Sequence, residues 1–164
     1  MSLPRPLAAA LNRLPLPIVQ QAVAVVFRRM MQQHPGLFDR LGPHASKRFL
    51  FSPTDLDFSF VVHPAGPSIL VCRPAKAPPA AAGIAGPLVT LLALLEGRID
   101  GDAVFFSREL TITGDMEAML ALRNGLDDCG FDLPKDLADM AGPLATPFRR
   151  IAEQVRERAL AGLV

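Results

Sequence analysis

The sequence contains neither tryptophan nor tyrosine, and all of its aromatic residues are the ten phenylalanines. Tyrosine and tryptophan bring a polar group that usually finds a hydrogen-bond partner when the ring is buried. Half of the residues are apolar, so an interior of Phe, Leu, Ile, Val and Met offers little to a polar ligand. The composition therefore favours either a plain hydrophobic core or a pocket for a lipid.

Cysteine and histidine are also scarce. The chain has two cysteines, Cys72 and Cys129, and three histidines, His34, His44 and His63, none with a second ligand at the spacing of a zinc site. P-loop, G-x-S-x-G and G-x-G-x-x-G motifs are missing too. We therefore expect no metal, no cofactor and no catalytic residue. The two thiols neither require nor exclude a disulfide, and a reducing cytoplasm is the default expectation.

Charge is sparse and unevenly placed along the chain. Residues 1–53 hold seven Lys or Arg against one Asp, whereas residues 54–139 hold six against thirteen acidic residues, and the net charge is +1. A basic N-terminal segment suits an anionic membrane surface or an acidic partner, although ordinary solvated helix faces are the simpler explanation. No basic run is dense enough to predict nucleic-acid binding.

No secretory signal and no membrane span are predicted. Arg5, Arg13 and four prolines interrupt the first 17 residues. Residues 77–95 are uncharged and long enough to span a membrane, but three prolines and two glycines break their first half. Only Leu88–Leu95 is strongly hydrophobic, and it is too short to cross. We expect a strand of small residues followed by a buried helix.

Hydrophobic periodicity predicts a mixture of helices and closely spaced strands. Val19, Val23 and Phe27 recur at helical spacing, whereas Phe58, Phe60 and Val62 alternate as in a strand with one covered face. From the N-terminus we expect a helix, four strands, a helix, a strand and a helix, over residues 18–33, 47–51, 56–62, 69–72, 80–85, 87–95, 109–113 and 116–129.

This order predicts an α+β fold with a single, mostly antiparallel sheet of about five strands and helices packed on one face, plus N- and C-terminal helices. The expected parts are an N-terminal helical arm (1–43), a central domain (44–130) and a C-terminal amphipathic helical segment (131–164). The apolar stripe of the last segment runs from Leu144 to Leu163.

Two stretches of the central domain resemble the sterol-carrier-protein type two family. In FFSRELTITGDMEAMLALRNGLDD (105–128), a phenylalanine-bearing turn precedes the last strand, and Gly114-Asp115 starts the last core helix. The run LLALLEG (91–97), followed by Asp100 and Asp102, is similar to the family's helix and its glycine-bearing exit loop. The resemblance covers about residues 47–130, and it implies a sterol-carrier-like, lipid-binding domain.

Within the family, the run DAVFFSR (102–108), the short length and the helical arm resemble most the bacterial lipid carriers that serve as accessory factors in ubiquinone biosynthesis. This narrower resemblance implies isoprenoid quinone intermediates or phospholipids as ligands. It also implies enzymes of the oxygen-independent branch of ubiquinone biosynthesis as partners. The expected location is cytoplasmic and peripheral to the inner membrane.

The candidate lipid-binding residues are the apolar side chains of the strand and the two helices around this motif, together with its phenylalanine pair. At helical spacing such stripes are more often plain core, so a solid interior stays an alternative. Arg98, Arg108 and Arg123 are candidates for contact with a phosphate or a quinone oxygen, although a lone Arg is usually a solvated surface charge. The candidate lipid-binding residues are Leu88, Leu91, Leu92, Leu95, Phe105, Phe106, Leu110, Ile112, Met116, Met119, Leu120 and Leu122.

Three functions fit these observations. The first is a non-catalytic protein that holds a hydrophobic lipid, with peripheral membrane contact and no nucleic-acid partner. The second is a protein–protein scaffold with a solid core, which recruits biosynthetic enzymes through its terminal helices. The third is a general sterol or acyl-lipid transfer protein.

Overall fold

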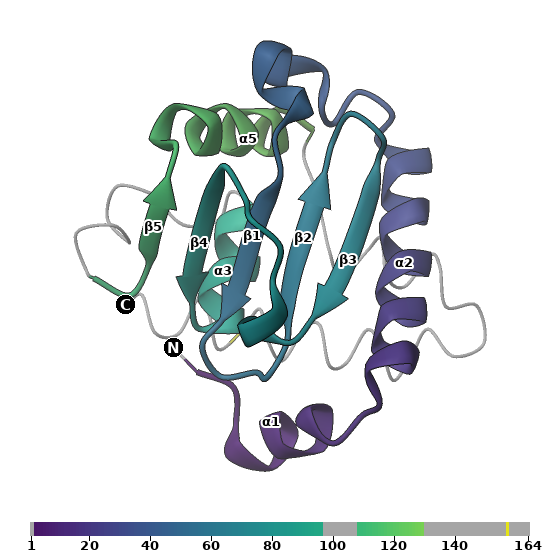
Figure 1. Ribbon diagram of the computed structural model, residues 1–164, viewed down its shortest axis with the longest axis vertical. Coiled ribbons are helices and arrows are strands. Elements are labelled where there is room, and N and C mark those ends of the chain that lie inside the picture. Colours follow the sequence, from purple (N-terminus) through teal and green to yellow (C-terminus); the bar gives the residue numbers. More distant parts are fainter. Residues whose placement is uncertain (1, 97–107, 130–156, 158–164) are drawn as a thin grey trace.

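The computed structural model describes residues 2–96, 108–129 and 157 of the chain. Its five-stranded sheet has the order β3-β2-β1-β4-β5, with helices around it (Figure 1). The strands are β1 (Phe49–Pro53), β2 (Ser59–His63), β3 (Ser68–Cys72), β4 (Ala82–Gly86) and β5 (Thr111–Gly114). The helices are α1 (Arg5–Asn12), α2 (Leu16–Gln33), α3 (Leu88–Leu95) and α5 (Met116–Cys129), with 3₁₀ segments η1 (Asp39–Ser46) and η2 (Pro74–Lys76). The predicted α+β fold is confirmed.

The sheet is mostly antiparallel, as predicted. β1–β2, β2–β3 and β4–β5 pair antiparallel, whereas β1 and β4 pair in parallel. A parallel pair needs a crossover connection. Here the chain leaves the edge strand β3 and returns through η2, which lies in front of the sheet in Figure 1, whereas α3 lies behind it.

One face of the sheet is apolar and faces helices α3 and α5. Phe51 lies directly opposite both Phe60 and Ile84, and Ile84 lies opposite Ile112. Residues that oppose each other on paired strands share a face, so these four side chains form one layer. Phe49, two residues before Phe51 and therefore on the same face, is fully buried. This layer is the floor of the candidate site.

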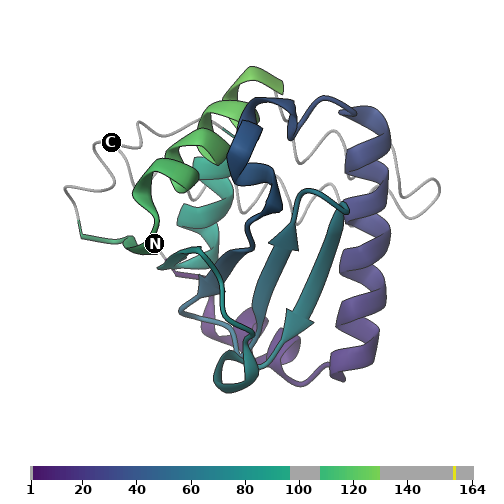
Figure 2. The same cartoon turned by 45° about the horizontal axis from the view of Figure 1, so that its top comes forward.

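Helix α2 lies along the outer edge of β3 (Figures 1 and 2). Its Gln20 side chain donates from Nε2 to the Ile69 carbonyl at 3.0 Å and accepts at Oε1 from the Val71 amide at 2.6 Å. One glutamine thus satisfies a donor and an acceptor that an edge strand would otherwise leave unpaired. The predicted helix over 18–33 is confirmed, and its apolar side packs on the sheet.

Helix α1 was not expected as a separate element, because prolines crowd residues 1–17. Proline at the first turn of a helix loses no intrahelical hydrogen bond, and Pro4 and Pro6 stand at the start of α1. Asp55 connects the residues before α1 to the start of α3, because its carboxylate accepts hydrogen bonds from the Leu3 amide at 2.8 Å and from the Leu88 amide at 2.9 Å. The same carboxylate therefore also caps the N-terminus of α3.

Residues 77–95 form β4 and α3, as expected. Glycines let β4 lie close to its neighbours. A Cβ on Gly86 would come within 2.5 Å of Leu110 Cδ2. Within the described part of the chain, no single helix is long and apolar enough to cross a membrane. Helices α1 and α2 together are long and apolar enough, but they are bent by 104° relative to each other.

Candidate functional site

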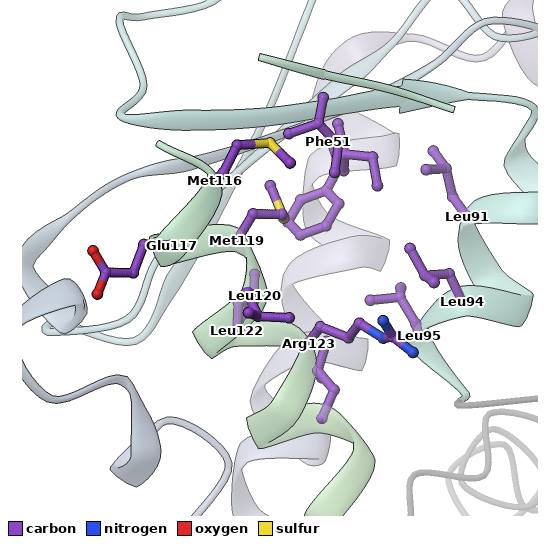
Figure 3. A pocket seen from close by; sticks show the side chains of 13 residues that line it. Phe51, Leu91, Leu94, Leu95, Met116, Glu117, Met119, Leu120, Leu122 and Arg123 are labelled. Atoms are coloured by element: carbon purple, nitrogen blue, oxygen red, sulfur yellow. The ribbon is translucent and has the colours of Figure 1, made fainter. Parts of the chain in front are cut away.

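A cavity of about 360 Å³ lies between the apolar face of the sheet and helices α3 and α5 (Figure 3). We call it the α3–α5 cavity. Each strand or helix contributes side chains from one face, which is why apolar residues at helical or alternating spacing meet there. Its lining consists of Phe51, Ile84, Leu91, Leu94, Leu95, Ile112, Met116, Glu117, Met119, Leu120, Leu122, Arg123 and Leu126.

A second cavity of about 230 Å³, which we call the α2 cavity, is bordered by α2, the residues just before η1, the strands β1 to β3, and helices α3 and α5. All of its described lining residues are apolar. Phe27, which lines it, stacks at a tilt against Phe38 with ring centroids 6.4 Å apart. The lining consists of Val23, Val26, Phe27, Met30, Leu37, Phe38, Phe51, Pro53, Phe60, Val62, Ile69, Leu88, Leu91, Leu92, Leu95, Leu122 and Leu126.

The two cavities adjoin each other. Five residues line both: Phe51, Leu91, Leu95, Leu122 and Leu126. The two cavities therefore share a wall of apolar side chains.

Most of the predicted lipid-binding residues border these cavities. Leu91, Leu95, Ile112, Met116, Met119, Leu120 and Leu122 line the α3–α5 cavity, and Leu88 and Leu92 line the α2 cavity. Leu110 lines neither cavity, and its side chain is buried beside Gly86. Phe105 and Phe106 lie outside the described residues. Whether the lining residues bind a ligand stays a prediction.

Several lining residues were not among the predicted ones. Phe51 and Ile84 form the floor, and the α2 cavity adds residues of α2 together with Leu37 and Phe38, which precede η1. The alternation of apolar residues in the strands and the stripe on α2 are both visible in the sequence. Neither pattern says which stripe faces which strand, because that depends on contacts far apart along the chain.

Among the described residues that line the α3–α5 cavity, two are charged, and both come from α5. Glu117 is exposed, whereas the side chain of Arg123 is 26% exposed. Arg123 pairs with Asp127 one turn later, with 3.8 Å between Nε and Oδ2. The exposed lining residues Met116 and Leu120, at 59% and 53%, place the mouth of the cavity on this side of α5.

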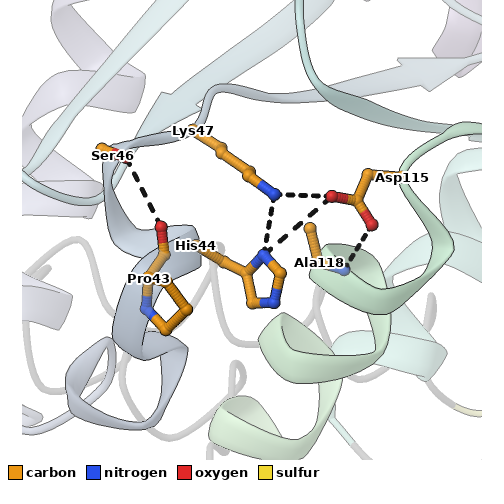
Figure 4. Close-up of polar contacts among 6 residues, drawn as sticks. All are labelled: Pro43, His44, Ser46, Lys47, Asp115 and Ala118. Atoms are coloured by element: carbon orange, nitrogen blue, oxygen red, sulfur yellow. Dashed lines mark hydrogen bonds and ion pairs between the residues drawn. The ribbon is translucent and has the colours of Figure 1, made fainter.

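The main polar cluster of the described chain involves residues that line neither cavity, and it joins the N-terminus of α5 to His44 and Lys47 (Figure 4). Lys47 Nζ donates to Asp115 Oδ2 at 2.6 Å and to His44 Nδ1 at 3.0 Å, and Asp115 Oδ1 accepts from the Ala118 amide at 3.1 Å. The hydrogen bond from Lys47, and then that from Ala118, hold the pKa of Asp115 below its usual range. Asp115 is thus the N-cap of α5, as the sequence predicted, and the cluster has a structural role.

The described residues offer no metal site, since they contain no group of three His, Cys, Asp or Glu side chains that could hold an ion. Burial raises the pKa of the Cys72 and Cys129 thiols. A raised pKa keeps a thiol protonated and poorly nucleophilic near neutral pH. Both thiols are free.

Comparison with known proteins agrees with this geometry. The model of the SCP-2 sterol transfer family matches residues 27–127. The structure of the "UbiJ-SCP2 Ubiquinone synthesis protein" is similar with a TM-score of 0.57 and 17% identity, over 74% of this chain and 99% of that one. A search of the curated proteins found no match.

Two sterol carrier proteins are similar at lower scores. Domain 2 of the sterol carrier protein from Helicoverpa armigera has a TM-score of 0.46 and 14% identity, over 65% of this chain and 89% of that one. Sterol Carrier Protein 2 from Yarrowia lipolytica, in its apo form, has a TM-score of 0.47 and 15% identity, over 66% and 88%.

Proposed function

Because the chain belongs to the SCP-2 sterol transfer family, we propose that it is a non-catalytic protein that holds a lipid between its sheet and helices α3 and α5. The observation that carries this proposal is the pair of adjoining apolar cavities, of about 360 and 230 Å³. Burial of an apolar chain contributes about 0.8 kcal/mol per methylene group. Useful affinity therefore needs few polar contacts, which suits a site with two charged residues.

The proposed ligand is an isoprenoid quinone intermediate or a phospholipid, and the proposed role is that of an accessory factor in oxygen-independent ubiquinone biosynthesis. The resemblance of residues 102–108 to the accessory factor UbiT supports this role. The fold shared with a ubiquinone synthesis protein is consistent with it. A general sterol or acyl-lipid transfer protein is the alternative, and ligand selectivity separates the two.

We propose a cytoplasmic location with peripheral contact to the inner membrane. The outer side of α2 exposes Ile18 at 55% and Val25 at 53%. Arg28 and Arg29 on the same helix are exposed beside them. An apolar stripe flanked by Arg is suited to the interface of an anionic bilayer, where a ligand could be collected.

Equilibrium binding of a prenylated phenol, a phospholipid and a sterol tests the proposal. Leu94 lines only the α3–α5 cavity, so Leu94→Trp should weaken binding of the preferred ligand by about tenfold or more. Leu70→Trp, at an exposed position of β3 that lines neither cavity, is the matched control and should bind normally. Absence of binding by all three ligands would refute a lipid-binding function, and tightest binding of the sterol would favour the general transfer protein.

A further inference from the structure

The lining of the α3–α5 cavity is asymmetric in charge. Arg123 is the only cation among its described lining residues, and Glu117 is the only anion. Both belong to α5, but Glu117 lies in the first turn, beside Met116, and Arg123 lies two turns further on. An anionic group at the mouth is therefore repelled at the Glu117 end and attracted at the Arg123 end.

Arg123 is placed to act across the cavity mouth. Met116, Leu120 and Arg123 follow one another at helical spacing along one side of α5, and the first two are exposed. Figure 3 shows the Arg123 side chain extended from α5 toward Leu95 of α3, at the far wall of the cavity. Its partial burial, at 26% exposure, strengthens the attraction between the guanidinium and a nearby anion relative to open water.

The guanidinium has unused hydrogen-bonding capacity. Its contact with Asp127 joins Nε to Oδ2 at 3.8 Å, which is too long for a hydrogen bond. Partly exposed pairs of this kind are weak. The planar fork of an Arg matches a carboxylate or a phosphate in a bidentate arrangement, so such a head group can replace Asp127 at little cost.

We infer that Arg123 is the head-group anchor of the cavity and that the ligand is an amphiphile with an anionic head, a carboxylate or a phosphate. The head lies against Arg123 at the mouth, and the apolar chain runs inward between Ile84 and Leu91. This inference rests on the proposed lipid-binding function and deepens it, because it makes Arg123 a determinant of specificity.

Three ligands with the same twelve-carbon chain test the inference: dodecanoate, dodecyl phosphate and dodecanol. Their dissociation constants are measured by displacement of a fluorescent acyl probe, below the critical micelle concentration. Arg123→Gln should weaken binding of at least one anion about tenfold, which corresponds to about 1.4 kcal/mol, and change dodecanol binding less than twofold. The anion with the larger loss identifies the head group.

Three further variants separate anchoring from general effects. Arg123→Lys keeps the charge without the fork and should recover part of the affinity. Asp127→Asn removes the competing carboxylate and should tighten anion binding. Lys76→Gln removes one positive charge from the exposed η2 segment, which lines neither cavity, and it should change nothing. An equal loss of affinity in this variant would attribute the effect to net charge.

The outcomes distinguish this inference from the function on which it rests. Equal loss of all three ligands in Arg123→Gln, or no loss of any, overturns the anchoring role and leaves the lipid-binding proposal intact. Failure of wild-type protein to bind any of the three overturns both. Thermal unfolding shows whether each variant is folded. Asp127→Asn changes the Arg123–Asp127 ion pair through its acidic partner and leaves Arg123 in place.

Discussion

Affinity should depend on the length of the ligand's apolar chain in a way that the two cavities determine. A water-sized group occupies about 30 Å³, so a cavity of about 360 Å³ takes roughly a dozen methylene groups. The adjoining cavity of about 230 Å³ takes roughly eight more. Each buried methylene contributes about 0.8 kcal/mol, which corresponds to about a fourfold change in the dissociation constant.

We therefore expect the affinity for a series of straight-chain alcohols to rise about fourfold per methylene up to about twelve carbons. The affinity should keep rising up to about twenty carbons if the chain passes Phe51 into the α2 cavity. Displacement of a fluorescent acyl probe, with the long alcohols delivered from cyclodextrin, measures the series. In Met30→Trp, which obstructs only the α2 cavity, the plateau should move back to about twelve.

Two results would refute this reasoning. Affinity that does not depend on chain length would mean that the cavities are filled in solution. Affinity that keeps rising in parallel for wild type and for Leu94→Trp would mean that the chain lies on the outer surface. Leu70→Trp is the control for an added ring outside the cavities, and its series should follow that of the wild type.

Three further predictions concern the scaffold that shapes the cavities. Gly114→Ala should destabilise the protein by at least about 1–2 kcal/mol in urea unfolding, because Gly114 has φ +77° and a Cβ would meet the Ala81 carbonyl; unchanged stability would contradict this. Gln20→Ala removes both hydrogen bonds to the edge of β3. It should cost about 0.5–1.5 kcal/mol for each bond and raise self-association in light scattering, whereas a monodisperse variant would mean that α2 shields the edge without it. Asp115→Asn keeps the cap but loses the ion pair with Lys47. Because the pKa of Asp115 is lowered in the folded protein, its stabilisation exists above the ordinary carboxyl pKa near 3.9 and is lost as the pH falls through the folded value. The stability difference from wild type should therefore shrink in acid, and a difference that grows there would exclude this role.

The order of strands and helices could be predicted because local apolar spacing determines it. The helix over 18–33 and the strand and helix within 77–95 each follow from periodicity together with proline and glycine positions. The sequence pattern does not reveal helix α1, because prolines usually interrupt a helix. Pro4 and Pro6 stand at the start of α1, where proline is tolerated.

The site was predictable in part, for a different reason. The apolar stripes of α3 and α5 lie within the two stretches that resemble the sterol-carrier family, so the sequence predicts most of their residues as lining. The parallel pairing of β1 with β4 and the contribution of Phe51 could not be predicted, because register between distant strands leaves no local signal. For the same reason the second cavity, under α2, was missed.

Photo-crosslinking with a fatty acid that carries a diazirine at the end of its chain tests the central claim most directly. Peptide mass spectrometry then locates the covalent adduct. The account predicts adducts in α3 and α5, among residues such as Leu94 and Met119 that line the α3–α5 cavity, and competition by an excess of unlabelled lipid. Adducts confined to the exposed side of α2, around Ile18 and Val25, or no adduct at all, would contradict a lipid-filled interior.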